Sequence, residues 1–161
     1  IESDILADGS LDYPESVLRK FDFVIASIHS RFQMDRDTMT ERMIQAIRNP
    51  RTRFIGHLTG RLLLGRKGYE LDMERVIREA AKYDVAIEIN AHPQRLDIDW
   101  RFGPQLRGAG TKVSVNPDAH ETAGYDDTRF GAWMAQKALL PSSLIVNSWD
   151  VKKVESWLKR K

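Results

Sequence analysis

Short runs of apolar residues alternate with segments of helical periodicity along the chain. Runs with the length and composition of buried strands cover 23–27, 53–56, 85–89, 112–115 and 144–146. Alternation of this kind is typical of repeated β-α units, in which the strands form a mainly parallel sheet. The pattern therefore predicts an α/β fold.

Helical periodicity is clearest over 72–83. One face of this segment carries the apolar residues Met73, Val76, Ile77, Ala80 and Ala81. Their spacing is that of an amphipathic helix. A second helix is predicted to begin at Asp37, as its N-cap, and to end at Asn49-Pro50. A third is predicted to begin at Asp150.

Polar residues follow the predicted strands at their carboxyl ends. In chain order these are His29, His57, Asn90, the Asp118-Ala-His120 motif and Asn147. Glu2 takes an equivalent place if Ile1 is the end of a strand. Barrel and open α/β enzymes build their active sites at this edge of the sheet. We therefore expect the functional site at the carboxyl ends of the strands.

The residue types at this edge favour a metal site. A single histidine after a strand is usually structural, but His29, His57 and His120 share the edge with Asp118. Neutral imidazole and carboxylate ligands suit Zn²⁺, Mn²⁺ or Fe²⁺ better than Mg²⁺ alone. The sequence has no cysteine and no Gly-x-Ser-x-Gly motif, so metal-activated water is the hydrolytic chemistry that remains.

The composition argues against a membrane protein. Of the 161 residues, 42% are hydrophobic and 30% charged, and no apolar run reaches the length of a membrane span. We therefore expect neither a transmembrane helix nor a signal peptide, and a cytoplasmic protein without a membrane partner. The absence of cysteine also excludes disulfides and thiolate ligands.

Basic residues are concentrated in one part of the chain, although the formal net charge is only +2. The stretch between Arg42 and Tyr69 contains no acidic residue. Its basic residues are Arg42, Arg48, Arg51, Arg53, Arg61, Arg66 and Lys67. Such a concentration suits a polyanion such as a phosphate backbone. The alternative is an ordinary solvated helix end and loop.

Several short motifs occur in a fixed order. They are Ile-Glu-Ser-Asp around Glu2, Ala-Ser-Ile-His ending at His29, Gly-His-Leu-Thr-Gly around His57, the run from Glu88 to Asp97, and Asp118-Ala-His120. Together they resemble the polymerase and histidinol phosphatase (PHP) domain, in particular the C-terminal PHP domain of bacterial family X DNA polymerases. The resemblance covers essentially the whole chain.

This resemblance implies that residues 1–161 form one partial PHP domain, the C-terminal part of a distorted TIM-like (β/α)7 barrel. It also implies a cluster of up to three divalent metal ions, Mn²⁺ or Zn²⁺, at the rim of the barrel. The matching ligand positions are Glu2, which resembles the bridging carboxylate, His29, His57, Asp118 and His120. The family's early His-x-His pair, a further aspartate and a further histidine have no counterpart here, and we expect them upstream of Ile1.

The activity implied is metal-dependent phosphodiester hydrolysis in DNA repair, with Glu2 and Asp118 as catalytic residues. The resemblance to bacterial family X enzymes implies a manganese-favouring 3′–5′ exonuclease that acts on single-stranded 3′ ends, with cutting at abasic sites as a further activity, beside a polymerase domain in the same chain. The candidate substrate-binding residues are Arg61, Arg66, Asn90 and Arg95. Alternatively, the first two form surface ion pairs and the last two a hydrogen-bond network at the rim. We assign Glu88 and Asp97 to structure.

Two other functions remain open. One is a small-molecule phosphomonoesterase of the histidinol phosphatase type, with the same metals and a closed pocket. The other is a structural module that has lost its metals. The basic segment argues mildly against the first, and the retained ligand positions argue against the second.

Overall fold

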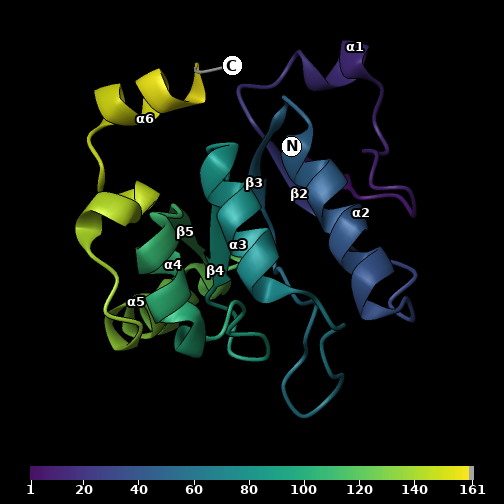
Figure 1. Cartoon of the computed structure of the whole chain (residues 1–161). Coiled ribbons are helices and arrows are strands. Elements are labelled where there is room, and N and C mark those ends of the chain that lie inside the picture. The colour runs from purple at the N-terminus through teal and green to yellow at the C-terminus, as the bar shows by residue number, and fades with distance from the viewer. Residues whose placement is uncertain (160–161) are drawn as a thin grey trace.

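The protein contains a single parallel sheet, seen in a computed structural model that describes residues 1–159 (Figure 1). Its five strands are hydrogen-bonded in the order β1-β2-β3-β4-β5, so neighbours in the chain are neighbours in the sheet. The strands are β1 (Glu2–Asp4), β2 (Val24–Ser27), β3 (Thr52–Ile55), β4 (Ala86–Asn90) and β5 (Val113–Asn116). The predicted α/β fold is confirmed.

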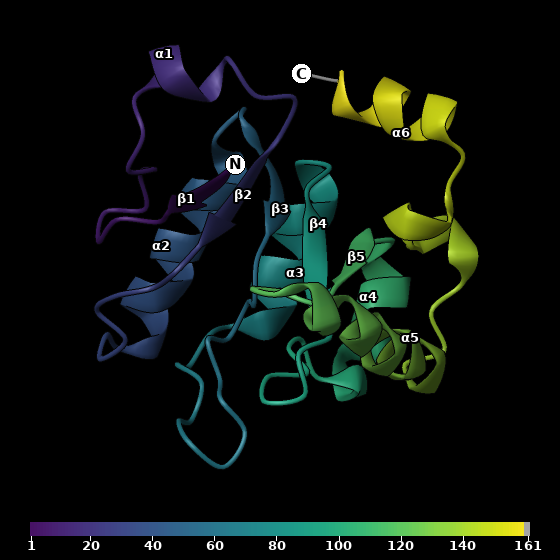
Figure 2. The same ribbon diagram turned by 180° about the vertical axis from the view of Figure 1, so that it is seen from behind.

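Helices connect the strands. They are α1 (Glu15–Leu18), α2 (Arg36–Arg48), α3 (Met73–Lys82), α4 (Gly103–Ala109), α5 (Thr128–Lys137) and α6 (Val151–Leu158). Parallel strands need long crossovers, and α2, α3 and α4 lie together over one face of the sheet (Figures 1 and 2). Among residues 1–159, no helix has the length and apolar character needed to cross a membrane.

The strand register separates two faces with different chemistry, because successive side chains of a strand point to opposite sides. The row that carries Ala26, Ile55, Ile87 and Val113 belongs to the main hydrophobic core. The row on the other face begins with Glu2, Ile25, Phe54 and Ala86. Toward the carboxyl ends of the strands this second face becomes polar, with Glu88, Asn90 and Asn116.

The second face is covered at the amino ends of the strands by α6. Trp157 is buried there, with its ring edge-on to Phe54 at 5.3 Å and to Trp149 at 5.8 Å between centroids. The Trp157 indole N–H donates to the Asp84 carbonyl just before β4, at 3.2 Å. Asp150 caps α6 by accepting from the Lys153 N–H, so the predicted start of this helix is confirmed.

The strand predicted over 144–146 is wrong. The segment forms two 3-10 turns, Ser142–Leu144 and Val146–Ser148, with one isolated bridge from Ile145 to Val113. The Asn147 side-chain amide takes the place of a further strand, because it accepts from the Val115 N–H at 2.7 Å and donates to the Val115 carbonyl at 2.9 Å. The backbone groups of β5 are thus satisfied without an extended neighbour.

The other predicted helices are also present. The helix predicted over 72–83 is α3, and Asp72 caps it by accepting from the Arg75 N–H. The cap predicted for α2 is wrong by two residues, since the Asp35 carboxylate accepts from the N–H groups of Asp37 and Thr38. The helices α1, α4 and α5 were not predicted.

Candidate metal site

Glu2, His29 and His57 come together, with His29 and His57 just after the carboxyl ends of β2 and β3. The expected place of Glu2 after a strand is wrong, because Glu2 is the first residue of β1. Each offers one ligand atom, and these atoms all lie within 4.8 Å of one another. Glu2 Oε1 is 3.6 Å from His29 Nε2 and 3.5 Å from His57 Nε2. The two imidazole rings are edge-on, with 5.0 Å between centroids. Both histidines therefore direct the same ring nitrogen toward one carboxylate oxygen.

The order of the strands explains this convergence. β1 carries Glu2, while His29 and His57 follow β2 and β3, which are its successive neighbours. Gly56, just before His57, allows the close approach of β3. A Cβ atom at Gly56 would lie 2.3 Å from Ser27 Oγ and 3.6 Å from Glu2 Oε1, so any side chain would displace the surroundings of Glu2.

Asp4 orients one of the two histidines. Its Oδ1 is 2.5 Å from His29 Nδ1, which leaves Nε2 of the same ring facing Glu2. A carboxylate behind a histidine fixes the ring and its tautomer in many metal sites. We did not single out Asp4 in the sequence, although it lies two residues beyond Glu2 and hence on the same face of β1.

The electrostatics of the group favour a permanently anionic Glu2. The contact with His57 lowers the pKa of Glu2 to about 2, although burial acts in the opposite direction. Burial lowers the pKa of His57, but the contact with Glu2 and the charges of Glu88 and Glu2 together outweigh it, and the pKa of His57 is raised. The Glu2 carboxylate is thus charged over the whole physiological range.

Asp118 lies in the same cavity without joining this group. The cavity has a volume of about 260 Å³ and is lined by Glu2, Phe23, Ile25, Phe54, His57, Glu88, Asn116 and Asp118. Asp118 Oδ2 is 3.2 Å from Arg95 Nε and accepts from Asn90 Nδ2 at 3.1 Å. Asp118 is therefore held by neighbouring side chains and faces the space in front of Glu2 and His57.

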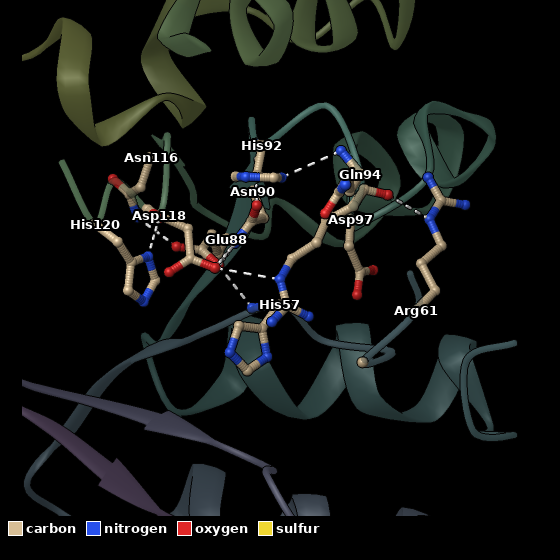
Figure 3. Close-up of polar contacts among 12 residues, drawn as sticks. His57, Arg61, Glu88, Asn90, His92, Gln94, Asp97, Asn116, Asp118 and His120 are labelled. Carbon is tan, nitrogen blue, oxygen red and sulfur yellow. Dashed lines mark hydrogen bonds and ion pairs between the residues drawn. The ribbon is translucent and has the colours of Figure 1, made fainter. Parts of the chain in front are cut away.

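His120 is exposed and lies beside Asp118 (Figure 3). Its Nδ1 is 2.8 Å from the Asp118 carbonyl oxygen, a contact within the same turn. The described structure thus gathers three of the predicted ligands tightly, places Asp118 in their cavity, and leaves His120 outside the group of ligand atoms.

The guanidinium groups of Arg61 and Arg66 are occupied within the protein. Arg61 pairs with Asp99 at 2.8 Å and donates to the carbonyls of Arg95 and Leu96. Arg66 donates to the Gly60 carbonyl and lies over the Phe32 ring. Both side chains therefore anchor the loop after His57, and Arg61 lies away from His57 and Asp118 in Figure 3.

The basic stretch does not form a continuous cationic surface. Arg42 and Arg53 are buried. Arg42 donates to the carbonyls of Ile5, Leu6 and Ser30, which makes it a structural residue. Acidic residues from elsewhere in the chain neutralise two others, since Glu79 pairs with Arg48 and Glu15 with Arg51. Although this stretch contains no acidic residue, the fold brings acidic residues from other segments next to it.

Asn90 and Arg95 act on the site through Asp118. Asn90 is fully buried, so it has no surface left for a substrate. Arg95 is paired with Asp118, and its Nη1 is buried without a hydrogen-bond partner in residues 1–159.

Glu88 and Asp97, the two acidic residues assigned to structure, are both buried. Burial raises the pKa of both carboxyl groups. Asp97 accepts from the N–H and hydroxyl of Thr59, in agreement with a structural role.

The chain is similar to proteins named as an exonuclease and as probable phosphatases. It is 39% identical over 160 residues to the DNA polymerase/3′-5′ exonuclease PolX of Bacillus subtilis, covering 99% of this chain and 28% of that protein. Probable phosphatases of Thermoanaerobacter sp. and Caldicellulosiruptor saccharolyticus are 32% and 41% identical, with 64% and 62% of their lengths covered. No family model matches the chain. The resemblance inferred from the motifs is confirmed, while the chain spans less than two thirds of each of these relatives.

Proposed function

We propose that this chain, which is similar over nearly its whole length to a bacterial polymerase and exonuclease, is the metal-binding part of a phosphoesterase that hydrolyses phosphodiester bonds in DNA. The observation that carries the proposal is the convergence of Glu2, His29 and His57 within 4.8 Å. The consecutive parallel strands also agree with a distorted TIM-like (β/α)7 barrel, of which residues 1–161 would be a part.

The donor set fits a divalent transition metal. Two imidazole nitrogens and one carboxylate are ligands that Zn²⁺ and Mn²⁺ accept. Glu2, His29 and His57 would hold one ion, with Asp118 and His120 available for others in a cluster of up to three. A divalent ion bound there supplies a water of lowered pKa and positive charge that offsets that of the phosphoryl oxygens.

The chain's own residues prepare this site. Glu2 is anionic and compensates the charge of a cation, while Asp4 holds the His29 ring in place. Asn90 and Arg95 fix Asp118 on the opposite wall of the cavity. Of the basic residues considered for substrate binding, Arg95 is the one that borders the site directly. Arg61 and Arg66 stabilise the adjacent loop.

The substrate we propose is a single-stranded 3′ DNA end, degraded in the 3′–5′ direction as part of DNA repair, with abasic sites as a second target and a polymerase domain in the same polypeptide. The name of the Bacillus subtilis relative supports this substrate. The relatives named as probable phosphatases support a second candidate, a phosphomonoesterase that uses the same residues.

One experiment separates these functions. The intact protein, loaded with Mn²⁺ or Zn²⁺, is given a 5′-labelled single-stranded oligonucleotide and, separately, p-nitrophenyl phosphate. We expect a ladder of shortened labelled strands, lost in His57→Ala and retained in the surface control Arg78→Ala, which alters only an exposed pair with Glu74. Cleavage of the monoester alone would establish the phosphatase. Metal binding without either activity would indicate a structural module.

A further inference from the structure

Glu88 is a buried carboxylate in the wall of the candidate metal cavity. It lies on β4 with 6% of its surface exposed and lines the cavity together with His57 and Asp118. The metal chemistry proposed above does not use it. Burial of a charge is unfavourable unless hydrogen bonds compensate for it, so the partners of this carboxylate show what holds it there.

Three donors from three segments converge on this carboxylate (Figure 3). Oε2 accepts from the backbone N–H of His57 at 2.6 Å and from Asn90 Nδ2 at 3.1 Å. Oε1 accepts from Asn116 Nδ2 at 3.0 Å. Glu88 thus ties the segment after β3 to the ends of β4 and β5.

The bond to His57 holds a strained backbone. His57 has a φ of +23°, which is unfavourable for a residue with a side chain. Its N–H is anchored by Glu88 while its Nε2 lies 3.5 Å from Glu2 Oε1. The direction of the imidazole therefore depends on a backbone conformation that the Glu88 carboxylate stabilises.

The bond to Asn90 extends the same connection to Asp118. The orientation of the Asn90 amide is fixed, because its Oδ1 accepts from the His92 N–H at 3.1 Å. Its Nδ2 consequently donates to both Glu88 Oε2 and Asp118 Oδ2, each at 3.1 Å. Asp118 also has a positive φ, +54°. One buried carboxylate thus connects two strained candidate ligands from different strands.

We propose that Glu88 is a positioning residue that fixes His57 and Asp118 relative to each other and thereby sets the metal affinity of the site. This inference rests on the proposed metal site and adds a residue to it. The alternative is that Glu88 contributes only to the stability of the core. The two roles make different predictions for metal binding.

Substitutions of Glu88 differ in how many hydrogen-bond acceptors the new side chain keeps for its three donors. Glu88→Gln keeps one oxygen for His57 and Asn90, and its amide can face Asn116 if the Asn116 amide turns over. Asn116 can turn because its other partner is the Ser114 hydroxyl, which is able to donate as well as accept. Glu88→Leu has a similar size but no acceptor, so all three hydrogen bonds to this side chain are lost.

Thr111→Val is a matched control for general destabilisation. Thr111 is fully buried, and its hydroxyl donates to the Ile77 carbonyl at 3.0 Å, on the helix-covered side of the sheet. Its loss should lower the melting temperature of the metal-free protein without changing the cavity. A shift in metal affinity that accompanies Glu88→Leu and not Thr111→Val is then specific to the site.

The experiment is a Mn²⁺ titration of the intact wild-type protein and the three variants, with the melting temperature recorded at each metal concentration. Loss of a residue that orients metal ligands typically weakens binding by about 10- to 100-fold. We expect a loss of this size for Glu88→Leu, an affinity close to wild type for Glu88→Gln, and an unchanged affinity for Thr111→Val. The Mn²⁺-induced rise in melting temperature should follow the same order.

Equal Mn²⁺ affinity in Glu88→Leu and wild type would overturn the proposal, as would an equal loss in Thr111→Val. If Glu88→Leu does not fold, Asn90→Ala breaks the branch to Asp118, together with the bond from the His92 N–H, and leaves the bond between Glu88 and His57 in place. An unchanged affinity in that variant would overturn the proposal too. A wild-type protein that binds Mn²⁺ but does not cleave DNA would refute the proposed function while leaving the role of Glu88 intact. A wild type that binds no Mn²⁺ would refute both.

Discussion

At the scale of the residue, the candidate site contains one carboxylate and one imidazole, Glu2 and His57, whose charges depend on each other. The depressed pKa of Glu2 and the raised pKa of His57 both come from their mutual contact. A group with a depressed folded pKa stabilises the protein above its unfolded pKa, and a group with a raised folded pKa does so below its unfolded pKa. The pair therefore stabilises the metal-free protein most between the ordinary values of 4.5 and 6.5.

This reasoning predicts the pH dependence of Glu2→Gln in the presence of a chelator. The variant should melt below the wild type between pH 4.5 and 6.5, because it lacks the anion that stabilises protonated His57. The difference should shrink as the pH falls toward 2, where Glu2 is protonated, and as it rises through the raised pKa of His57. Melting curves over this range provide the measurement. A difference that does not vary with pH, as expected for the exposed control Glu74→Gln, would contradict the coupling.

Individual residues also show how far sequence alone could lead. The proximity of His29 and His57 was predictable, because parallel strands bring their carboxyl ends to one edge. Glu2 was expected after a strand but is the first residue of β1. For Arg61 the sequence left open substrate binding or an ion pair, and the structure shows a pair with Asp99, which is distant in the chain. Glu88 was assigned to structure because only the folded sheet shows which donors meet at its carboxylate.

At the scale of the element, most strands of the sheet were predictable, but the structure beside β5, the last strand, was not. The apolar run over 144–146 looks like a strand, but pairing with β5 is supplied by the Asn147 side chain. The periodicity of apolar residues indicates which residues are buried. It does not indicate that a side-chain amide, here that of Asn147, forms the hydrogen bonds that a neighbouring strand would otherwise form. The short helices α4 and α5 were missed for a related reason, since Gly103 and Gly131 occupy buried helix positions where larger apolar residues would have given a signal.

Asn147 should therefore matter more than an exposed polar residue normally does. Asn147→Ala removes both hydrogen bonds to Val115 and should lower the free energy of unfolding by about 1–2 kcal/mol. Asn147→Asp keeps the acceptor for the Val115 N–H but sets an oxygen against the Val115 carbonyl, so it should be no better than alanine. Urea denaturation measures both, with the exposed Gln136→Ala as the control.

At the scale of the whole molecule, the second face of the sheet has two ends with different roles. The carboxyl ends of the strands carry the polar cavity, and the amino ends are filled by the aromatic contact of Phe54 with Trp157 from α6. Both the cavity and the aromatic contact are formed by residues from several segments, so no single segment of the sequence predicts either one. The arrangement arises because α6, the last helix, folds back against β3 and β4.

The apolar side of the cavity has a consequence for turnover if the chain acts on DNA as proposed. A DNA 3′ end in the cavity would meet Phe23, Ile25 and Phe54, and we expect the excised nucleotide to leave through the opening by which the DNA entered. Product and the next 3′ end then compete for one passage, and added deoxynucleoside monophosphate should inhibit competitively against DNA. Initial rates at increasing monophosphate concentration test this, and inhibition independent of DNA concentration would show that departing nucleotides follow a separate route.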